Sequence, residues 1–202
     1  NPNNVVASGK DTSISQWPDR SGERNSASQD SEAVRPQKAK IKGRDAVAFD
    51  GQSYLSIKHY ADITFDAGSD YTVSAWVYLG DAVGSGWRGI VTKSRDKSPW
   101  YGLWLDGGGN YVFGGSGENL SGGQIQKGWH HICGVQTGNE SRVIYVDGRL
   151  AGKGRALTAN GGGDLWIGGA KSVKEFFTGA LGEVRIYRRA LSHPEVAHLA
   201  KN

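Results

Sequence analysis

Aromatic and cationic side chains crowd the segment between residues 87 and 104, and these residue types point to a binding chemistry. The candidates are three indoles and three cations: Trp87, Trp100, Trp104, Arg88, Lys93 and Arg95. A sugar ring packs its apolar C–H face on an indole, while arginine offers a planar fork of donors to hydroxyl, carboxylate or sulfate oxygens. The segment therefore predicts a carbohydrate-binding surface that uses exposed tryptophan with arginine and lysine. The alternative is that some of these indoles belong to the core.

Alternation along residues 101–106 predicts where Trp104 points. In a strand, successive side chains face opposite sides, so Leu103 and Leu105 share one face and Trp104 lies on the other. If the leucines face the core, Trp104 faces solvent, beside Trp100 at the start of the strand. We therefore expect Trp104 to be an exposed stacking platform.

Catalytic patterns are weak in this chain. Retaining glycosidases hold two carboxylates about 5 Å apart across the scissile bond. Here the only acidic pair at positions i and i+2 is Asp30 and Glu32, in a polar stretch without strand character. His131 and Cys133 share one strand face, but nothing nearby marks a third, orienting group, so a packed cysteine is favoured. We assign no catalytic residue and expect no enzyme activity, although a lyase or hydrolase with an unfamiliar acid/base pair stays open.

Length and composition predict one globular domain, residues 1–202. The chain has 37% hydrophobic and 22% charged residues and 31 glycines, which is typical of a fold rich in turns. Cys133 is the only cysteine, so a disulfide scaffold is excluded. Methionine is absent, and we interpret the chain as a module of a larger secreted protein, a monomer tethered to other domains.

Charge and hydropathy bear on the partners. No apolar run approaches the roughly 18 residues that span a bilayer, so membrane insertion is not expected. The chain has 24 basic and 20 acidic residues, and this small basic surplus favours anionic glycans over neutral ones. Lysine and arginine crowd residues 35–44, but the aromatic residues that stack on bases are missing there, so nucleic acid is not an expected partner.

The elements that must position these residues are strands. Runs of β-branched and aromatic residues between Gly, Asn and Asp clusters predict strands at 71–79, 89–93, 101–106, 111–114, 129–136, 142–146, 164–167 and 179–187. Short edge strands are predicted at 14–17 and 46–49. Ser192 and Glu195 form a capping-box pattern that opens the only predicted helix. The expected fold is all-β, an antiparallel two-sheet sandwich with a short C-terminal helix.

An ordered set of motifs covers nearly the whole chain. It comprises Trp17-Pro18-Asp19-Arg20-Ser21-Gly22, Phe49-Asp50-Gly51, the strand from Tyr71 to Val77, Trp129 to Val135, Val143 to Gly148, Asp164 to Gly169, and Phe177 to Ser192. The set resembles the laminin-G-like jelly roll of the concanavalin A-like lectin and glucanase superfamily. That resemblance implies extracellular glycan binding, often as an accessory module of polysaccharide-degrading enzymes, and sometimes binding of protein partners.

The resemblance also implies at most one structural calcium ion. Its most plausible carboxylates are Asp50 and Glu183, because the N- and C-terminal strands of this fold tend to lie side by side. The alternative is a turn aspartate and an exposed strand glutamate. The family's last strand often carries an acidic residue where this chain has Gly182, which weakens transfer of the site.

Overall fold

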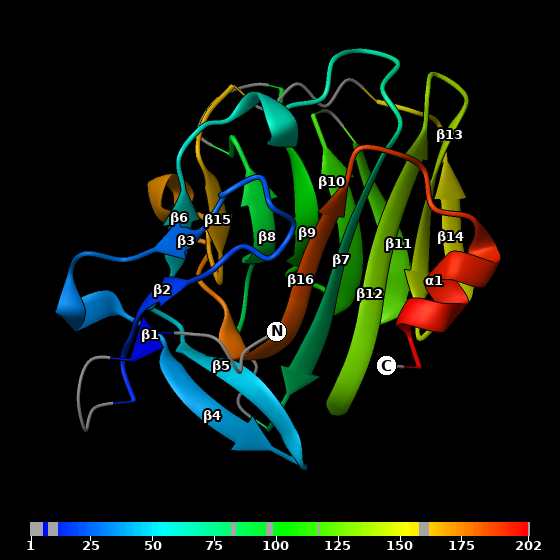
Figure 1. Ribbon diagram of the computed structural model, residues 1–202. Helices are drawn as coiled ribbons and strands as arrows, with labels where there is room; N and C mark the ends of the chain where they lie inside the picture. Colours follow the sequence, from blue (N-terminus) through cyan, green and yellow to red (C-terminus); the bar gives the residue numbers. More distant parts are fainter. Residues whose placement is uncertain are drawn as a thin grey trace.

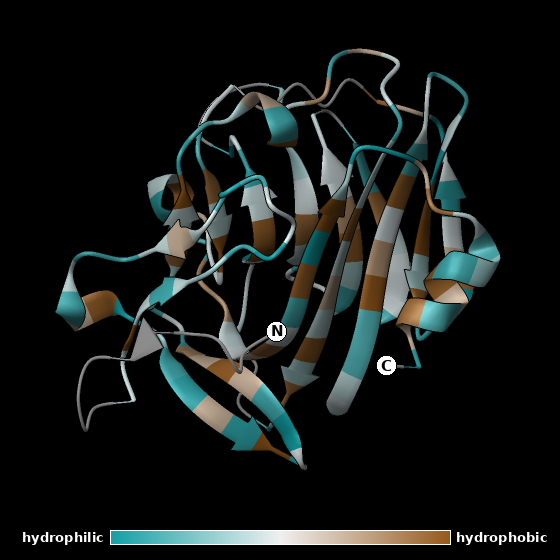
Figure 2. Ribbon diagram, in the orientation of Figure 1, coloured by the Kyte–Doolittle hydropathy of each residue, from teal (hydrophilic) through white to brown (hydrophobic). Residues whose placement is uncertain are grey.

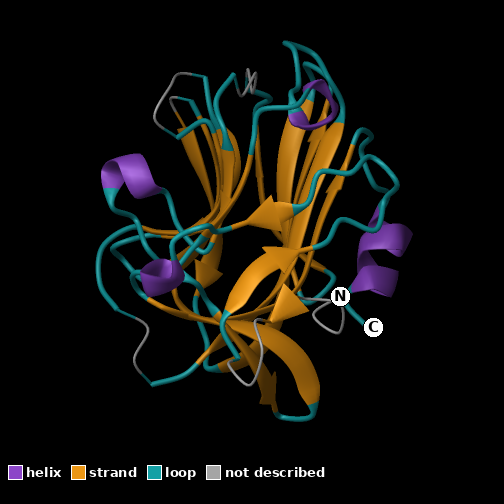
Figure 3. Cartoon of the chain, turned by 60° about the vertical axis from the view of Figure 1, so that its left-hand side comes forward, coloured by secondary structure: helices purple, strands orange, loops and turns teal. Residues whose placement is uncertain are grey.

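The computed structural model describes residues 6–7, 12–81, 84–95, 99–116, 118–157 and 162–201. Its strands form two antiparallel sheets that pack face to face as a β-sandwich (Figures 1 and 3). The larger sheet has nine strands, in the order β1 (Val6–Ala7), β2 (Ile14–Trp17), β3 (Ala27–Ser28), β6 (Leu55–Ile57), β15 (Leu165–Ile167), β8 (Arg88–Lys93), β9 (Tyr101–Leu105), β10 (Asn110–Gly115) and β11 (Glu118–Gln124).

The second sheet has seven strands. Their order is β14 (Arg149–Gly154), β13 (Ser141–Val146), β12 (Gly128–Thr137), β7 (Tyr71–Leu79), β16 (Thr178–Tyr187), β5 (Arg44–Asp50) and β4 (Gln37–Ile41). In the described part of the chain, three short 3-10 helices, η2 (Glu32–Val34), η3 (Ala61–Ile63) and η4 (Lys171–Val173), lie in the connections. The predicted two-sheet fold is confirmed.

The core fills the space between the sheets. Alternate residues of each strand point inward, and the strands are banded in hydropathy along their length (Figure 2). In β7, for example, Tyr71, Val73, Ala75 and Val77 belong to this core. Thr72 and the other residues between them point away from the core.

Helix α1 (His193–Leu199) covers part of the outer face of the seven-stranded sheet. Ser192 caps it in a capping box with Glu195, as the sequence predicts. Val196 of the helix packs with Cys133 and Tyr145 in a small separate cluster, and Cys133 is fully buried there. Burial raises the pKa of the Cys133 thiol to about 12. No helix in the described ranges has the length and apolar character needed to cross a bilayer.

Candidate functional site on the outer face of the nine-stranded sheet

Strand β9 places Trp104 on the outer face of the nine-stranded sheet, the face turned away from the other sheet. Leu103 and Leu105 belong to the core, so the predicted alternation is confirmed. The predicted exposure is wrong, because only 1% of Trp104 is accessible to solvent. The indole therefore faces outward but is covered.

Two glycines make the space in which this indole lies. A Cβ on Gly114 would stand 2.9 Å from Cζ3 of Trp104, so the ring lies directly against the backbone of β10. Gly102 has φ +154°, and a Cβ there would approach the carbonyl oxygen of Val91 to 2.1 Å. Both positions therefore require glycine for the strands and the ring to pack as they do.

A buried carboxylate completes the cover. Glu175 follows η4 and is 7% exposed. Its Oε2 accepts a 2.9 Å hydrogen bond from Nε1 of Trp104, and Arg95 donates to both carboxylate oxygens, from Nη2 at 2.8 Å and from Nε at 3.1 Å. Sequence reasoning missed Glu175, because a single acid in an irregular loop carries no motif that singles it out.

The solvent-facing part of this cluster is the Trp100–Arg95 pair. The guanidinium carbon of Arg95 lies 4.6 Å from the ring centroid of Trp100, within cation–π distance. The Arg95 side chain is 26% exposed and Trp100 is half-buried. Trp100 also packs edge to face on Trp104, with the centroids 5.3 Å apart. Glu175 and Trp104 thus fix the pair from below.

A second aromatic group lies on the same sheet face. Trp166 of β15 is opposite Thr92 of β8, which is opposite Gly102 of β9, and the neighbours of Trp166 in its strand face the core. Tyr54 packs against Trp166 and against Phe176, at centroid distances of 6.2 and 6.0 Å. We call these five rings the aromatic face: Tyr54, Trp100, Trp104, Trp166 and Phe176. All but Trp104 are half-buried, and all but Trp100 and Trp104 were missed from the sequence.

The other predicted cations are not available to a ligand. Arg88 is 3% exposed and donates 2.8 Å hydrogen bonds to the carbonyl oxygens of Gly84 and Asp106. Lys93 is fully buried, with its ammonium group bonded to the carbonyl of Gly163 and 3.1 Å from Nδ1 of His59. The prediction that these two side chains reach a ligand is wrong, because their polar ends tie strand termini to neighbouring loops.

Trp87 is exposed but lies apart from the aromatic face. It is 39% exposed and precedes Arg88, which pairs with Leu105 at one end of the β8–β9 ladder. Trp100 precedes Tyr101, which pairs with Lys93 at the opposite end. The structure therefore does not bring Trp87 together with Trp100.

The two predicted metal ligands do not meet. Strands β5 and β16 are neighbours, as expected, but Asp50 lies opposite Thr178 rather than Glu183. Asp50 accepts backbone hydrogen bonds from Gln52 and Ser53, and these lower its pKa although burial raises it. Glu183 is paired with Arg185 at 2.8 Å. Within the described ranges, no three His, Cys, Asp or Glu side chains gather as a metal site would require.

The calcium ion itself stays a prediction without assigned ligands. An ion bound only by the folded chain would add about 2.7 kcal/mol of stability at a concentration of 100 times its Kd. EDTA should then lower the melting temperature, and added calcium should restore it. An unchanged melting temperature after exhaustive chelation would contradict the prediction of a structural calcium ion.

Comparison with protein families gives one match. Residues 49–197 match the family model Laminin_G_3, described as the concanavalin A-like lectin/glucanases superfamily. No curated protein sequence matches the chain.

Solved structures of similar fold include an accessory domain and two toxin domains. Domain 4 of AbnA, an extracellular GH43 arabinanase from Geobacillus stearothermophilus in complex with arabinotriose, has a TM-score of 0.63 and 22% identity over 82% of this chain and 81% of that one. The binding domain of Paraclostridial Mosquitocidal Protein 1 has a TM-score of 0.70 and 17% identity, covering 97% of this chain and 50% of that one. The binding domain of Botulinum neurotoxin DC, in complex with rat synaptotagmin II, has a TM-score of 0.62 and 10% identity, covering 94% of this chain and 51% of that one. The chain spans about half the length of both toxin structures, and at these identities the likeness shows the fold.

Proposed function

The chain belongs to the concanavalin A-like lectin/glucanases superfamily, and from that premise we propose that it is a carbohydrate-binding module without catalytic activity. Two findings support this proposal. A domain of similar fold was solved with a bound oligosaccharide, arabinotriose. The aromatic face of this chain also presents partly exposed rings of the kind that stack on sugars.

The Trp100–Arg95 pair is the observation that carries the proposal. Its indole is half-buried, so one part of the ring is held by Trp104 while another faces solvent. Arg95 is held by both oxygens of Glu175, so its guanidinium loses little conformational freedom when a ligand binds. A sugar ring that stacks on Trp100 would find the remaining N–H donors of Arg95 beside it.

The ligand class follows from the charges on this face. Arg88 and Lys93 are buried, and Arg95 is neutralised by Glu175, so the cations expected to attract an anionic glycan are already engaged. Among the described residues, Lys171 is an exposed cation near this face, with Nζ 5.7 Å from the ring centroid of Tyr54. The proposal therefore shifts from an anionic polysaccharide to a neutral one.

The setting of the module is part of the same proposal. A similar domain belongs to an extracellular polysaccharide-degrading enzyme. By analogy, this chain is a secreted module, monomeric by itself, that brings a larger protein to its polysaccharide.

Replacement of Trp100 by alanine tests this site. Aromatic stacking on planar ligands contributes about 1–3 kcal/mol, so Trp100→Ala should weaken binding to linear arabinan by a corresponding amount in calorimetry. Trp87→Ala is the matched control, because it removes an exposed indole at the opposite end of the ladder. Equal losses in the two variants would contradict the assignment of this face.

Ionic strength tests the ligand class. If the ligand is neutral, affinity for linear arabinan should change little between 0.02 and 0.3 M salt, because ionic attraction is what salt screens. Polygalacturonate serves as the anionic probe, and binding to it that is tighter and falls with salt would restore the anionic alternative. Binding to neither polymer, nor to other polysaccharides on a glycan array, would favour a protein partner instead.

A further inference from the structure

A cavity of about 530 Å³ opens where strand β16 parts from β5. β5 pairs with β16 from Thr178 to Leu181, and a bulge follows. Beyond Leu181, β16 continues beside β7, and no described strand pairs with its other edge. The loop between β2 and β3, the segment from β6 to η3, and strand β15 close around this opening, so the cavity is built by four separate parts of the chain, β16 included.

Apolar side chains from both sheets form the floor of the cavity. They include Trp17, Ile57, Ile63, Ile167, Val184 and Ile186. Ile57 and Ile167 face inward from the nine-stranded sheet, whereas Trp166 faces outward from the same strand as Ile167. The cavity and the aromatic face therefore lie on opposite sides of that sheet.

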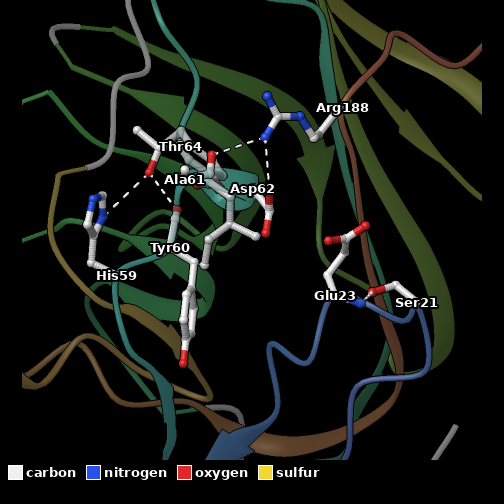
Figure 4. Close-up of polar contacts among 10 residues, drawn as sticks. Ser21, Glu23, His59, Tyr60, Ala61, Asp62, Thr64 and Arg188 are labelled. Atoms are coloured by element: carbon white, nitrogen blue, oxygen red, sulfur yellow. Dashed lines mark hydrogen bonds and ion pairs between the residues drawn. The ribbon is translucent and has the colours of Figure 1, made fainter.

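One carboxylate–guanidinium pair lines the wall formed by η3 and the end of β16. Asp62 of η3 lies 3.5 Å from Nη1 of Arg188, which also donates to the carbonyl oxygen of Ala61 at 3.1 Å (Figure 4). Glu183 and Arg185 also pair with each other, at 2.8 Å between Oε2 and Nη2, but they alternate with Val184 and Ile186 and so face the outer side of β16. The Asp62–Arg188 pair places an acceptor and a donor side by side at the edge of an apolar floor.

The loop between β2 and β3 supplies the facing wall in a fixed shape. The Asp19 carboxylate accepts hydrogen bonds from the backbone N–H of Ser21 at 2.8 Å and of Asn25 at 2.9 Å. Glu23 on this loop points toward Asp62 and Arg188 (Figure 4). The carboxamide oxygen of Asn25, also in the lining, is buried and accepts no hydrogen bond from any described residue.

We propose that this cavity binds one neutral sugar ring, as a second site apart from the aromatic face. Vicinal hydroxyls act as donors and acceptors together, which matches a carboxylate beside a guanidinium, and the C–H face of the ring matches the apolar floor. Apart from Glu183 and Arg185, the lining residues include three with carboxylates, Asp19, Glu23 and Asp62, and two with guanidinium groups, Arg20 and Arg188, so the cavity has no positive excess to attract an anion. Its volume lies in the range of about 300–1,000 Å³ of small-ligand sites. A single ring held here would be a chain end or a side branch of a polysaccharide.

Free monosaccharides are the probes that separate this site from the aromatic face. The whole chain is titrated with glucose, galactose, mannose, xylose and arabinose, with glucuronate as the anionic and glucosamine as the cationic counterpart, by calorimetry and ligand-detected NMR. At least one neutral sugar should bind more tightly than either charged sugar. Asp62→Asn and Arg188→Ala should weaken that binding at least about tenfold, because each removes a hydrogen bond to a charged group.

Matched variants make each outcome decisive. Arg189→Ala removes the adjacent arginine, which is paired with Glu195 outside this cavity, and it should leave monosaccharide binding unchanged. Trp100→Ala should also leave it unchanged while it weakens polysaccharide binding. Asp62→Asn keeps the shape of the side chain, so it isolates the charge if Arg188→Ala unfolds. Failure of every neutral sugar to bind, preference for a charged sugar, or loss of binding in Trp100→Ala would overturn the proposal. If no neutral sugar binds, the proposal that polysaccharide binds at Trp100 is unaffected.

Discussion

Replacement of Trp104 by alanine is expected to lower the free energy of unfolding by about 3–5 kcal/mol, the usual cost of truncating a buried large aromatic side chain. Trp104 is among the largest fully buried side chains, and its removal would leave a void over the glycines of β9 and β10. It would also leave the Glu175 carboxylate without one of its donors. Urea unfolding followed by circular dichroism measures the change.

Two further variants separate packing from polar contacts in this cluster. Trp87→Ala removes an exposed indole and should change stability by no more than about 0.5 kcal/mol. Glu175→Gln keeps an oxygen that can accept from Trp104 but removes the charge that holds Arg95, so a loss of about 1–2 kcal/mol is expected. A Trp104→Ala protein as stable as Trp87→Ala would show that the indole is not packed as described.

Acid should destabilise the fold through His131. The side chain is 2% exposed, beside Trp76 on the outer face of the seven-stranded sheet. Burial lowers its pKa from 6.5 to about 4, assisted by Arg185 and Arg44 and opposed by Asp147 and Glu183. The unfolded chain therefore binds a proton near pH 6.5 that the folded chain resists until about pH 4. Stability is retained above pH 6.5 and lost as pH falls toward 4, by about 3 kcal/mol in total.

Replacement of His131 by a residue that does not titrate should remove this pH dependence of stability. His131→Leu should show a flatter profile of unfolding free energy between pH 6.5 and 4, whatever its stability at neutral pH. His198→Gln replaces an exposed histidine on helix α1 and should keep the wild-type profile. The pKa values of Asp19 and Asp50 are lowered from 3.8 in the folded chain. The stability that these two carboxylates contribute is therefore lost mainly below about pH 4, outside this range. Parallel profiles for wild type and His131→Leu would contradict the assignment.

The strands that carry regular alternation could be predicted from the sequence. The run at 71–79 coincides with β7, and that at 142–146 with all but the first residue of β13, because β-branched and aromatic residues alternate there without interruption. Strand β11 (Glu118–Gln124) was not predicted, since its polar and glycine residues mark a turn as readily as a strand. Pairing with β10 makes it a strand, and that contact is not encoded locally.

The candidate site was predicted less well, for a physical reason. Alternation tells which face of a sheet a side chain takes, and it placed Trp104 correctly. It says nothing of what lies over that face. Here the loop that carries Glu175, far along the chain, folds back over β8 and β9 and converts an outward-facing indole into a buried one. The burial of Trp104 depends on this long-range contact, and the burial of Lys93 depends on another, with Gly163.

The thiol under helix α1 provides a built-in probe of motion. Cys133 is fully buried, its pKa is near 12, and it packs against Val196 of the last helix. An alkylating reagent needs an accessible thiolate, so it can react only when this corner of the molecule opens. Because the chain has a single cysteine, the alkylation rate would report how often helix α1 detaches from the sheet, without any introduced label.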